Sequence, residues 1–347
     1  MRLHDTQTAP DLVRRPGQTV AELIAGYLRW RGVERVYGLC GGHIQPVWDA
    51  LARLGVRIVD VRHECAAVFM AHAEAELTGR PGVALVTAGP GLTNAVTGVA
   101  NASTARAPVL VLSGRPPRPQ TGRGALQELP QRAIVAPLCR AALTADRVRE
   151  VLPRLDEAML ATAGATAPPG PVYLDFPTDL LAEHVRPADT ADWTAAPAGV
   201  PEILPGPACL TRAAGLIGAA RRPVVIAGRE AREAAPELAS LLESTGIPYL
   251  DSGESRGVLS RDHPSVVSAV RGRAMREADL VITLDRKPEL PAGLRLGGGV
   301  QPGREVPPGR PLHQPAVRQP ARRRRSAVLG QGLRRRARGR AARAGTR

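Results

Sequence analysis

Aromatic residues are scarce in this sequence, where they make up 3% of 347 residues. Any hydrophobic core must therefore be formed largely by Ala, Val and Leu. The total hydrophobic content of 44% is ordinary for a globular protein. The length allows about two domains.

Cysteine is rare as well, and the cysteines are far apart in the sequence. None belongs to a C-x-x-C pair, which argues against both a disulfide framework and a zinc site and favours free thiols in a reducing compartment. The four are Cys40, Cys65, Cys139 and Cys209.

Long apolar runs are absent too. No run approaches the ~20 residues that a membrane-spanning helix needs, and residues 1–17, MRLHDTQTAPDLVRRPG, have no apolar signal core. We therefore expect no membrane association, a cytoplasmic location, and a disordered lead at residues 1–17.

Positive charge is abundant but unevenly distributed. The formal net charge is +15, yet residues 288–347 alone hold 15 Arg, no Lys and two acidic residues. This segment could be a basic arm that binds nucleic-acid phosphates. However, the whole chain contains a single lysine, Lys287, and GC-rich coding DNA would produce such a preference for Arg over Lys. The segment also lacks the interleaved aromatic residues that nucleic-acid-binding arms often have. We favour an out-of-frame or degenerate tail, so nucleic acid is not the expected partner.

Apolar strand-like runs alternate with helical segments between residues 18 and 180. Thr19 and Glu22 form a capping box that predicts the start of the first helix. Such alternation predicts an α/β fold, a doubly wound parallel sheet with helices on both faces. The expected strands are 33–39, 56–61, 82–87, 108–113 and 171–175, and the later helices are 44–54, 64–78, 92–104 and 148–162.

The rest of the chain divides into three segments. Residues 181–206 are rich in Ala, Pro and Thr and lack periodicity, which indicates a linker. Residues 207–287 carry three expected strands and a helix at 236–246, which indicates a partial second α/β domain. Residues 288–347 have no sustained period and are expected to be disordered. The strands of the partial domain are 223–228, 247–251 and 278–285.

Ligands of open parallel sheets bind at the carboxyl ends of the strands, so the loops there are the candidate site. They contain CGGH (40–43), RHE (62–64), AGPGLTN (88–94) and a long loop that ends in GALQE (124–128). Neither a G-x-G-x-x-G fingerprint nor a Walker loop is present, so a dinucleotide or nucleotide phosphate site is not indicated.

Single residues in these loops also have simpler interpretations. Glu64 could merely favour the positive end of its helix, which is worth ~0.3–1 kcal/mol. Asn94 could be a surface amide, and Gly89 and Gly91 could be turn glycines. From spacing alone, these alternatives stay open.

The loops taken together resemble a known family. GLCGGHIQPVWDAL, RHE, VTAGPGLTNAVTGVANA and GALQE, in this order and spacing, resemble the N-terminal pyrimidine-binding domain of thiamine diphosphate enzymes of the acetolactate synthase family. The resemblance covers about residues 18–180 and continues more weakly over 206–287, the start of a central domain. GGHI and RGALQ are closer to the acetolactate synthase-like 2-hydroxyacyl-CoA lyases.

The resemblance implies roles for particular residues. Glu64 would be the carboxyl that hydrogen-bonds N1′ of the aminopyrimidine and promotes its imino tautomer. Partial burial favours a carboxyl that shares a proton, and Ala66, Ala67, Val68 and Phe69 could supply dry surroundings. Gly41 and Gly42 match the loop that approaches the cofactor, and Pro90 and Asn94 match the segment at the pyrimidine pocket. Gln127 matches a Gln that contacts the reacting centre, beside Leu126 where the family has Phe.

Parts of the family pattern are missing from the sequence. No G-D-G motif of the domain that holds Mg²⁺ and the diphosphate is present, so we expect this chain to offer the pyrimidine half only and no metal ligands. Pro168 stands where biosynthetic acetolactate synthases have an Arg that contacts FAD, so FAD is not expected. A reading-frame change near residue 287 would explain both the missing domain and the tail, and we expect a truncated chain.

The resemblance implies a thiamine diphosphate-dependent carboligase or lyase that acts on a 2-keto acid, as in branched-chain amino acid biosynthesis, or on a 2-hydroxyacyl-CoA. We expect the chain to be inactive alone and to need a homodimer or a partner chain that supplies the diphosphate-binding domain. The alternative is a non-catalytic pyrimidine-domain module or pseudoenzyme that pairs with a partner.

Overall fold

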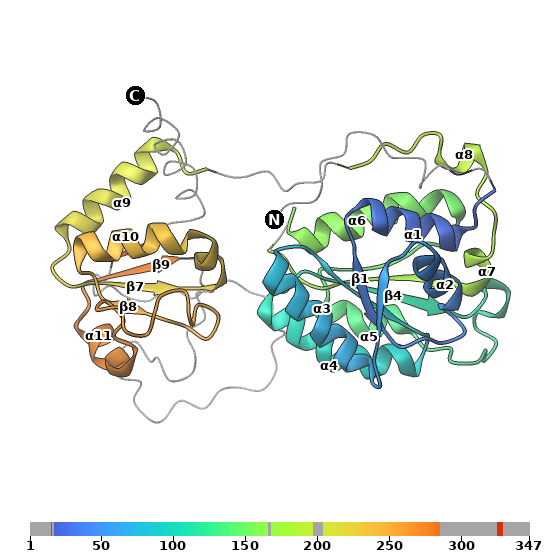
Figure 1. Ribbon diagram of the computed structural model, residues 1–347, viewed down its shortest axis with the longest axis horizontal. Helices are drawn as coiled ribbons and strands as arrows, with labels where there is room; N and C mark the ends of the chain where they lie inside the picture. The colour runs from blue at the N-terminus through green and yellow to red at the C-terminus, as the bar shows by residue number, and fades with distance from the viewer. Residues whose placement is uncertain (1–14, 16, 166–167, 197–203, 285–324, 329–347) are drawn as a thin grey trace, which may run out of the picture. The chain divides into compact units, whose positions relative to one another are not determined.

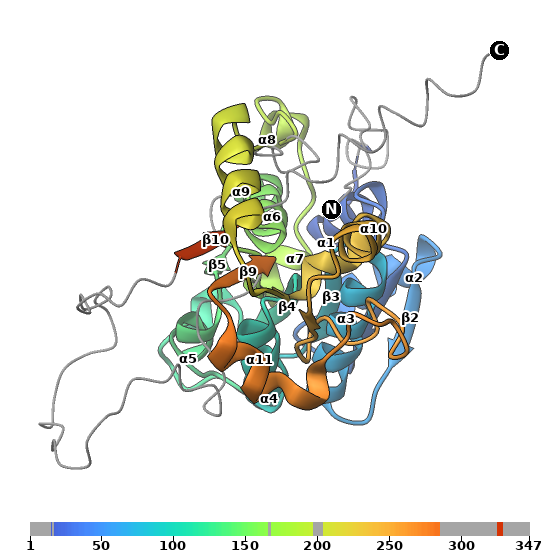
Figure 2. The same cartoon turned by 90° about the vertical axis from the view of Figure 1, so that its left-hand side faces the viewer.

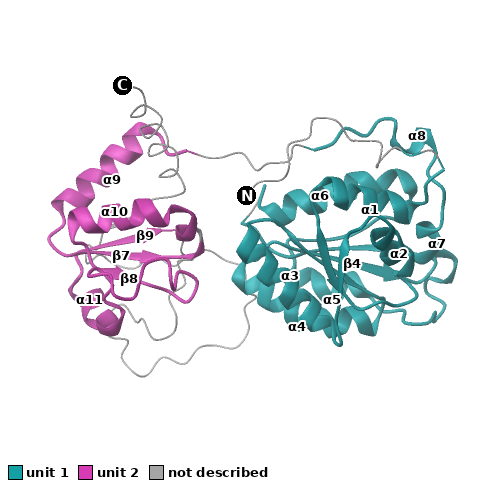
Figure 3. Ribbon diagram, viewed as in Figure 1, with its two compact units in different colours: residues 1–201 teal, residues 202–347 magenta. Residues whose placement is uncertain are grey.

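The computed structural model describes residues 15, 17–165, 168–196, 204–284 and 325–328. The chain forms two compact units, residues 1–201 and residues 202–347 (Figure 3). Each unit contains its own parallel sheet. The predicted α/β fold is therefore confirmed.

Unit 1 follows the alternation that the sequence predicts. The capping box is present, since the Thr19 hydroxyl accepts from the Glu22 N–H and the Glu22 carboxylate accepts from the Thr19 N–H. The main helices are α1 Val20–Trp30, α2 Gln45–Arg53, α3 Glu64–Thr78, α4 Pro90–Ala105, α5 Gln131–Val135 and α6 Val148–Ala163. The strands are β1 Arg35–Gly38, β2 Arg57–Asp60, β3 Gly82–Val86, β4 Val109–Arg115, β5 Ala141–Thr144 and β6 Val172–Pro177. Short helices complete the unit: η1 Arg118–Gln120, η2 Ala136–Leu138, α7 Thr178–Leu181 and α8 Pro187–Thr190.

The six strands form one parallel sheet in the order β2-β1-β3-β4-β6-β5. After β1 the chain pairs β2 on one side, then crosses so that β3 pairs on the other side of β1. This reversal places the topological switch point between the carboxyl ends of β1 and β3, the expected ligand position of a doubly wound sheet.

Helices cover both faces of this sheet (Figures 1 and 2). Helices α1, α2 and α6 contribute to one hydrophobic core, and α3, α4 and α5 contribute to the other. Strands β3, β4 and β6 lie in the middle and are almost entirely buried, which explains why their sequences are continuous apolar runs rather than alternating ones.

Two sequence-based expectations for unit 1 need correction. No strand is predicted at 141–144, yet the edge strand β5 forms there, and its four residues are all only half-buried. The linker prediction for residues 181–206 is wrong for its first part, because Val185 and Trp193 are buried in the core of unit 1. Trp193 packs edge-on against Tyr27 and Trp30, so burial overrides the lack of periodicity.

Unit 2 contains a four-stranded parallel sheet in the order β10-β9-β7-β8. Its strands are β7 Pro223–Ala227, β8 Tyr249–Leu250, β9 Leu280–Leu284 and β10 Arg325–Val328. Its helices are α9 Pro207–Ala219, η3 Arg229–Ala234, α10 Ala235–Thr245, η4 Ser268–Val270 and α11 Arg271–Glu277. Helices α10 and α11 contribute to separate hydrophobic cores of the unit.

Strand β10 lies within the tail that was expected to lack regular structure. It pairs in parallel with β9 along all four of its residues, so the structure differs from the expectation there. The other residues of 288–347, and residues 1–14 and 16 of the predicted lead at 1–17, lie outside the described residues. Among the residues described, no helix is both long and apolar enough to cross a membrane.

Candidate cofactor-binding site

The loops after β1 and β3 meet at the switch point. Both contact Thr87, the residue that follows β3. A Cβ added at Gly41 would lie 2.5 Å from Thr87 Cβ, and one added at Gly91 would lie 2.7 Å from Thr87 Cγ2. Only glycine fits such close approaches. The structure thus brings Gly41 and Gly91 together, as the loop pattern predicts.

Glu64 is the first residue of α3 and is only 6% exposed. The Nδ2 amide of Asn94, on α4, donates to Glu64 Oε2 at 3.0 Å. Glu64 Oε1 lies 3.5 Å from the position of a Cβ added at Gly91, and within the described residues it forms no hydrogen bond. Asn94 is exposed, yet it is not simply a surface amide, because it fixes one oxygen of a buried carboxyl and leaves the other available.

The helix-end interpretation of Glu64 is compatible with this arrangement. Glu64 lies in the first turn of α3, where a carboxylate is stabilised by the helix dipole. The residue before it, His63, is the N-cap and accepts from the Cys65 N–H through Nδ1 at 3.2 Å. A capped helix start holds the Glu64 carboxyl at a defined position.

The turn between β3 and α4 has a backbone shape that requires glycine. Gly89 has φ 60° and ψ −112°, a conformation that L-residues rarely adopt. Pro90 follows as the first residue of α4 and is exposed, which suits its fixed φ. A Cβ at Gly89 would lie 2.5 Å from the carbonyl oxygen of Gln127. Gln127, itself at φ 61°, therefore lies against this turn.

Gly42 differs from the other predicted glycines. It is exposed, and an added Cβ would meet nothing within 4 Å. Packing inside this chain therefore gives no reason for glycine at this position.

Glu128 is a site residue that the sequence interpretation did not single out. Its carboxylate accepts from the backbone N–H groups of Gly122, Gly124 and Ala125. These bonds, the one from Gly122 first, lower the pKa of Glu128. A carboxylate held by convergent N–H groups organises the loop that carries Leu126 and Gln127. The glycines at 122 and 124, both with positive φ, were the available signal.

Gln131 was also missed. It is only 3% exposed, and its Oε1 accepts from the Gly89 N–H at 2.7 Å. A buried glutamine three residues after GALQE offers no periodic signal, so its role could not be recognised from the sequence.

The apolar residues expected around Glu64 differ in burial. Ala67 and Val68 are fully buried. Phe69 is 42% exposed, as is Met70, because the helical turn directs them away from the core that buries Ala67 and Val68. Within this chain the exposed Phe69 gives no support to the expectation that it shields Glu64, and Leu126 is 78% exposed as well.

Comparisons with known proteins identify two domains in this chain. Residues 18–134 match the thiamine pyrophosphate enzyme N-terminal TPP binding domain, and residues 210–285 match the central domain of the same enzymes. The chain belongs to the thiamine pyrophosphate enzyme family. Glu64, Asn94 and the glycine loops all lie inside the first match.

Individual relatives come from two groups within this family. The chain is 36% identical to 2-hydroxyacyl-CoA lyase 2 of Homo sapiens over an alignment 295 residues long, which covers 75% of this chain and 46% of that protein. It is also 36% identical to the acetolactate synthase large subunit IlvG of Mycobacterium tuberculosis over 302 residues, 85% of this chain and 52% of that protein. The chain thus spans about half the length of the curated relatives it matches.

The residues present fit the aminopyrimidine part of thiamine diphosphate. One oxygen of a buried carboxyl, Glu64 Oε1, is available to a ring nitrogen. The Thr87 hydroxyl, buried between Gly41 and Gly91, has no hydrogen-bond partner within the described residues. In the same part of the chain, no group of three or more His, Cys, Asp or Glu side chains could hold a metal ion.

Proposed function

We propose that this chain supplies the pyrimidine-binding half of a thiamine diphosphate site in a carboligase or lyase. The observation that carries the proposal is the buried Glu64 carboxyl, held by Asn94 at the switch point of the sheet. The substrate would be a 2-keto acid or a 2-hydroxyacyl-CoA, the classes suggested by the two groups of relatives.

Bound thiamine diphosphate supplies an acidic C2–H and a 4′-amino group that can remove that proton. Glu64 would hold or release a proton at Oε1, toward the N1′ nitrogen, while Asn94 keeps Oε2 engaged. Gly41 and Gly42 allow the backbone to approach the cofactor, and Pro90 begins the helix beside it. Gln127, resting on Gly89, would face the reacting centre.

The diphosphate and its Mg²⁺ would be held by residues outside the printed sequence, which contains no G-D-G motif. We propose that a second copy or a partner chain provides that half. The exposed Phe69 and Met70, on the helix that begins with Glu64, support a polypeptide that covers this face. We do not propose FAD as a cofactor. All four cysteines are free thiols. The cytoplasmic location expected from the sequence stays a prediction.

Complementation tests this function. The chain is mixed with Mg²⁺, thiamine diphosphate and the C-terminal half of the acetolactate synthase relative, and assayed with pyruvate and with a 2-hydroxyacyl-CoA. We expect activity only in the mixture, and Glu64→Gln should lower it by about 10²–10⁴-fold, the usual contribution of a proton-transfer group.

Glu74→Gln is the matched control, since Glu74 lies on the same helix and pairs with Arg35 away from the site. It should leave turnover close to that of the unaltered chain. Turnover by the chain alone would contradict the need for a second half. Cofactor binding without turnover in any mixture would favour the non-catalytic module instead.

A further inference from the structure

Gln131 connects three separate elements of unit 1. Its Oε1 accepts from the Gly89 N–H at 2.7 Å, at the start of α4. Its Nε2 donates to the Gly114 carbonyl at the end of β4, at 3.1 Å, and to the Tyr173 hydroxyl on β6, at 2.6 Å. Gln131 is only 3% exposed, so its amide is largely shielded from solvent.

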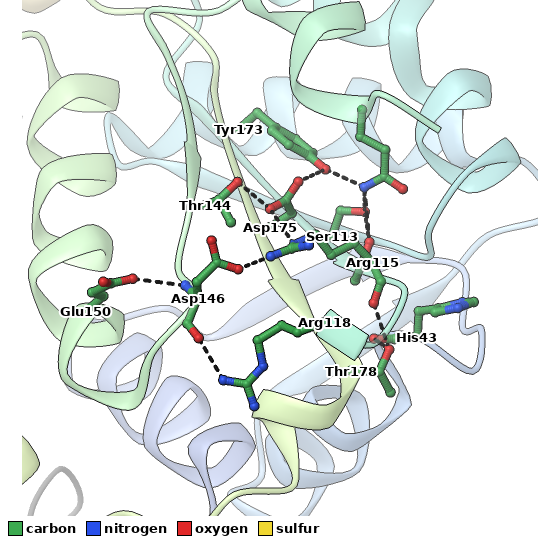
Figure 4. Close-up of polar contacts among 12 residues, drawn as sticks. His43, Ser113, Arg115, Arg118, Thr144, Asp146, Glu150, Tyr173, Asp175 and Thr178 are labelled. Carbon is green, nitrogen blue, oxygen red and sulfur yellow. Dashed lines mark hydrogen bonds and ion pairs between the residues drawn. The ribbon is translucent and has the colours of Figure 1, made fainter. Parts of the chain in front are cut away.

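The direction of these hydrogen bonds is determined by the groups beyond Gln131. The Tyr173 hydroxyl donates to Asp175 Oδ2 at 2.9 Å, so it can only accept from Gln131. Thr144 donates to Asp175 Oδ1 at 2.7 Å, and Arg115 lies 3.6 Å from the same oxygen. Figure 4 shows Tyr173, Asp175, Thr144 and Arg115 converging in this way. The Gln131 amide therefore has one orientation, with Oε1 toward Gly89.

The group that Gln131 holds is the turn that begins α4. Gly89 adopts its positive-φ conformation there, Gln127 packs against it, and Asn94 lies one turn further along α4, where it binds Glu64. A shift of Gly89 would move both the Gln127 contact and the Asn94 amide.

We propose that Gln131 is a positioning residue, which fixes the Gly89 turn to β4 and β6 and thereby sets the Asn94–Glu64 pair for the aminopyrimidine. This role rests on the function proposed above. Among the described residues, Gln131 forms no hydrogen bond with Glu64 or Asn94, so it would act through the backbone of α4.

Hydrogen exchange of the Gly89 N–H in the full chain tests the clamp. Gln131→Leu removes the acceptor and both donors, so we expect Gly89 to exchange about tenfold faster, the factor expected for one lost hydrogen bond. Thr162→Val is the matched control, because Thr162 is buried and its hydroxyl bonds only within α6, to the Ala158 carbonyl. It should leave Gly89 exchange unchanged.

Gln131→Glu provides a pH readout that packing alone would not give. The introduced carboxyl faces the Gly114 carbonyl, Tyr173 and, behind Tyr173, Asp175, with Gly89 N–H as a donor. Protonated, it can accept from Gly89 and donate to Tyr173. Ionised, it still accepts from Gly89 but has no donor for the Gly114 carbonyl and Tyr173, and a buried charge that faces a carbonyl oxygen is displaced from the site, which releases Gly89 as well. The ratio of variant to wild-type exchange at Gly89 should therefore approach one in acid and rise as the pH increases. If Gln131→Leu fails to fold, this variant still decides the question.

Binding of the free aminopyrimidine, 4-amino-5-hydroxymethyl-2-methylpyrimidine, completes the test. We expect its Kd to rise by about the same factor as Gly89 exchange in each variant. Unchanged exchange in Gln131→Leu, or a Gln131→Glu effect that does not vary with pH, would overturn the clamp. Faster exchange with an unchanged Kd would overturn the positioning role. If the wild-type chain does not bind the aminopyrimidine at all, the proposed function fails and the positioning role with it, while exchange alone still reports whether the clamp exists.

Discussion

At the scale of single residues, the site depends on a small number of close approaches. Glu64 was identifiable from the sequence because RHE follows a strand and recurs in a family pattern. Its contact with Asn94 arises because α3 and α4 begin after β2 and β3, the strands on either side of β1, and contribute to the same hydrophobic core. The position of Thr87, by contrast, could be recognised only from the structure. Nothing in the sequence V-T-A-G-P-G indicates that the threonine side chain packs between Gly41 and Gly91.

The two adjacent glycines after β1 should respond differently to a methyl group. Gly41→Ala would place Cβ 2.5–2.8 Å from the Thr87 side chain, and overpacking of this kind costs about 1–3 kcal/mol of unfolding free energy. Gly42→Ala meets nothing within 4 Å and should leave stability unchanged while lowering aminopyrimidine affinity. Urea unfolding and ligand titration measure the two effects. Equal stability loss in both variants would contradict the described packing.

At the scale of elements, helices and strands with strong periodicity were predictable and those held by tertiary contacts were not. Helix α3 has the predicted bounds, 64–78, because it starts at a capped carboxylate and ends at Gly79 in the left-handed conformation. Strand β5 and the segment around Trp193 depend on partners distant in the chain, such as β6 and α1. The local sequence pattern around β5 and Trp193 contains no information about these distant partners.

The segment after α8 is attached to unit 1 by a buried ion pair. Arg31 and Asp156 are 5% and 6% exposed and bond to each other. Asp156 also accepts from Trp193 Nε1 at 2.8 Å, and the Arg31 guanidinium lies 4.3 Å from the Trp30 ring centroid.

Asp156→Asn should destabilise unit 1 strongly. The change leaves the buried Arg31 charge uncompensated, which costs about 3–5 kcal/mol of unfolding free energy. Glu157→Gln is the control, since its pair with Arg154 is half-exposed and worth at most about 1 kcal/mol. Denaturant unfolding followed by tryptophan fluorescence reports both. A loss in Asp156→Asn no larger than in the control would show that the buried pair does not hold this segment.

Asp175 should make stability fall as the pH rises. Burial raises the pKa of this carboxyl, against the opposing hydrogen bonds of Thr144 and Tyr173 and the charge of Arg115. A raised folded-state pKa favours the protonated form, so ionisation costs stability above the unfolded value of about 3.9. The wild type should therefore lose unfolding free energy relative to Asp175→Asn as the pH increases from acid toward neutral.

Asp179 supplies the opposite case as a control. Desolvation acts to raise its pKa, but the hydrogen bonds and charge of Arg118 outweigh it and lower the pKa. Relative to Asp179→Asn, the wild type should gain stability as the pH rises and lose it in acid. Unfolding free energies measured across this pH range test both signs. If the wild type changed in the same direction with pH relative to Asp175→Asn and to Asp179→Asn, the opposite pKa shifts of the two carboxyls would be contradicted.

At the scale of the whole molecule, the sequence predicted a doubly wound unit with a smaller second unit, and the structure confirms both. It could not show that Arg325–Val328 adds a strand to the second sheet, because four residues among arginines carry no alternation. The proposed site could likewise be predicted only in part. Loop motifs point to Glu64 and the glycines, whereas Gln131 and Glu128 could be recognised only from hydrogen bonds that form after folding.

We propose that this chain binds only the pyrimidine half of the cofactor and does so through Glu64. The most direct measurement is an NMR titration of the full chain with the free aminopyrimidine, thiamine, and thiamine diphosphate with Mg²⁺. We expect three similar dissociation constants, on the order of 1 mM for a fragment-sized contact, and loss of binding of all three ligands in Glu64→Gln. Thiamine diphosphate binding that is far tighter and depends on Mg²⁺, or binding unaffected by Glu64→Gln, would contradict it.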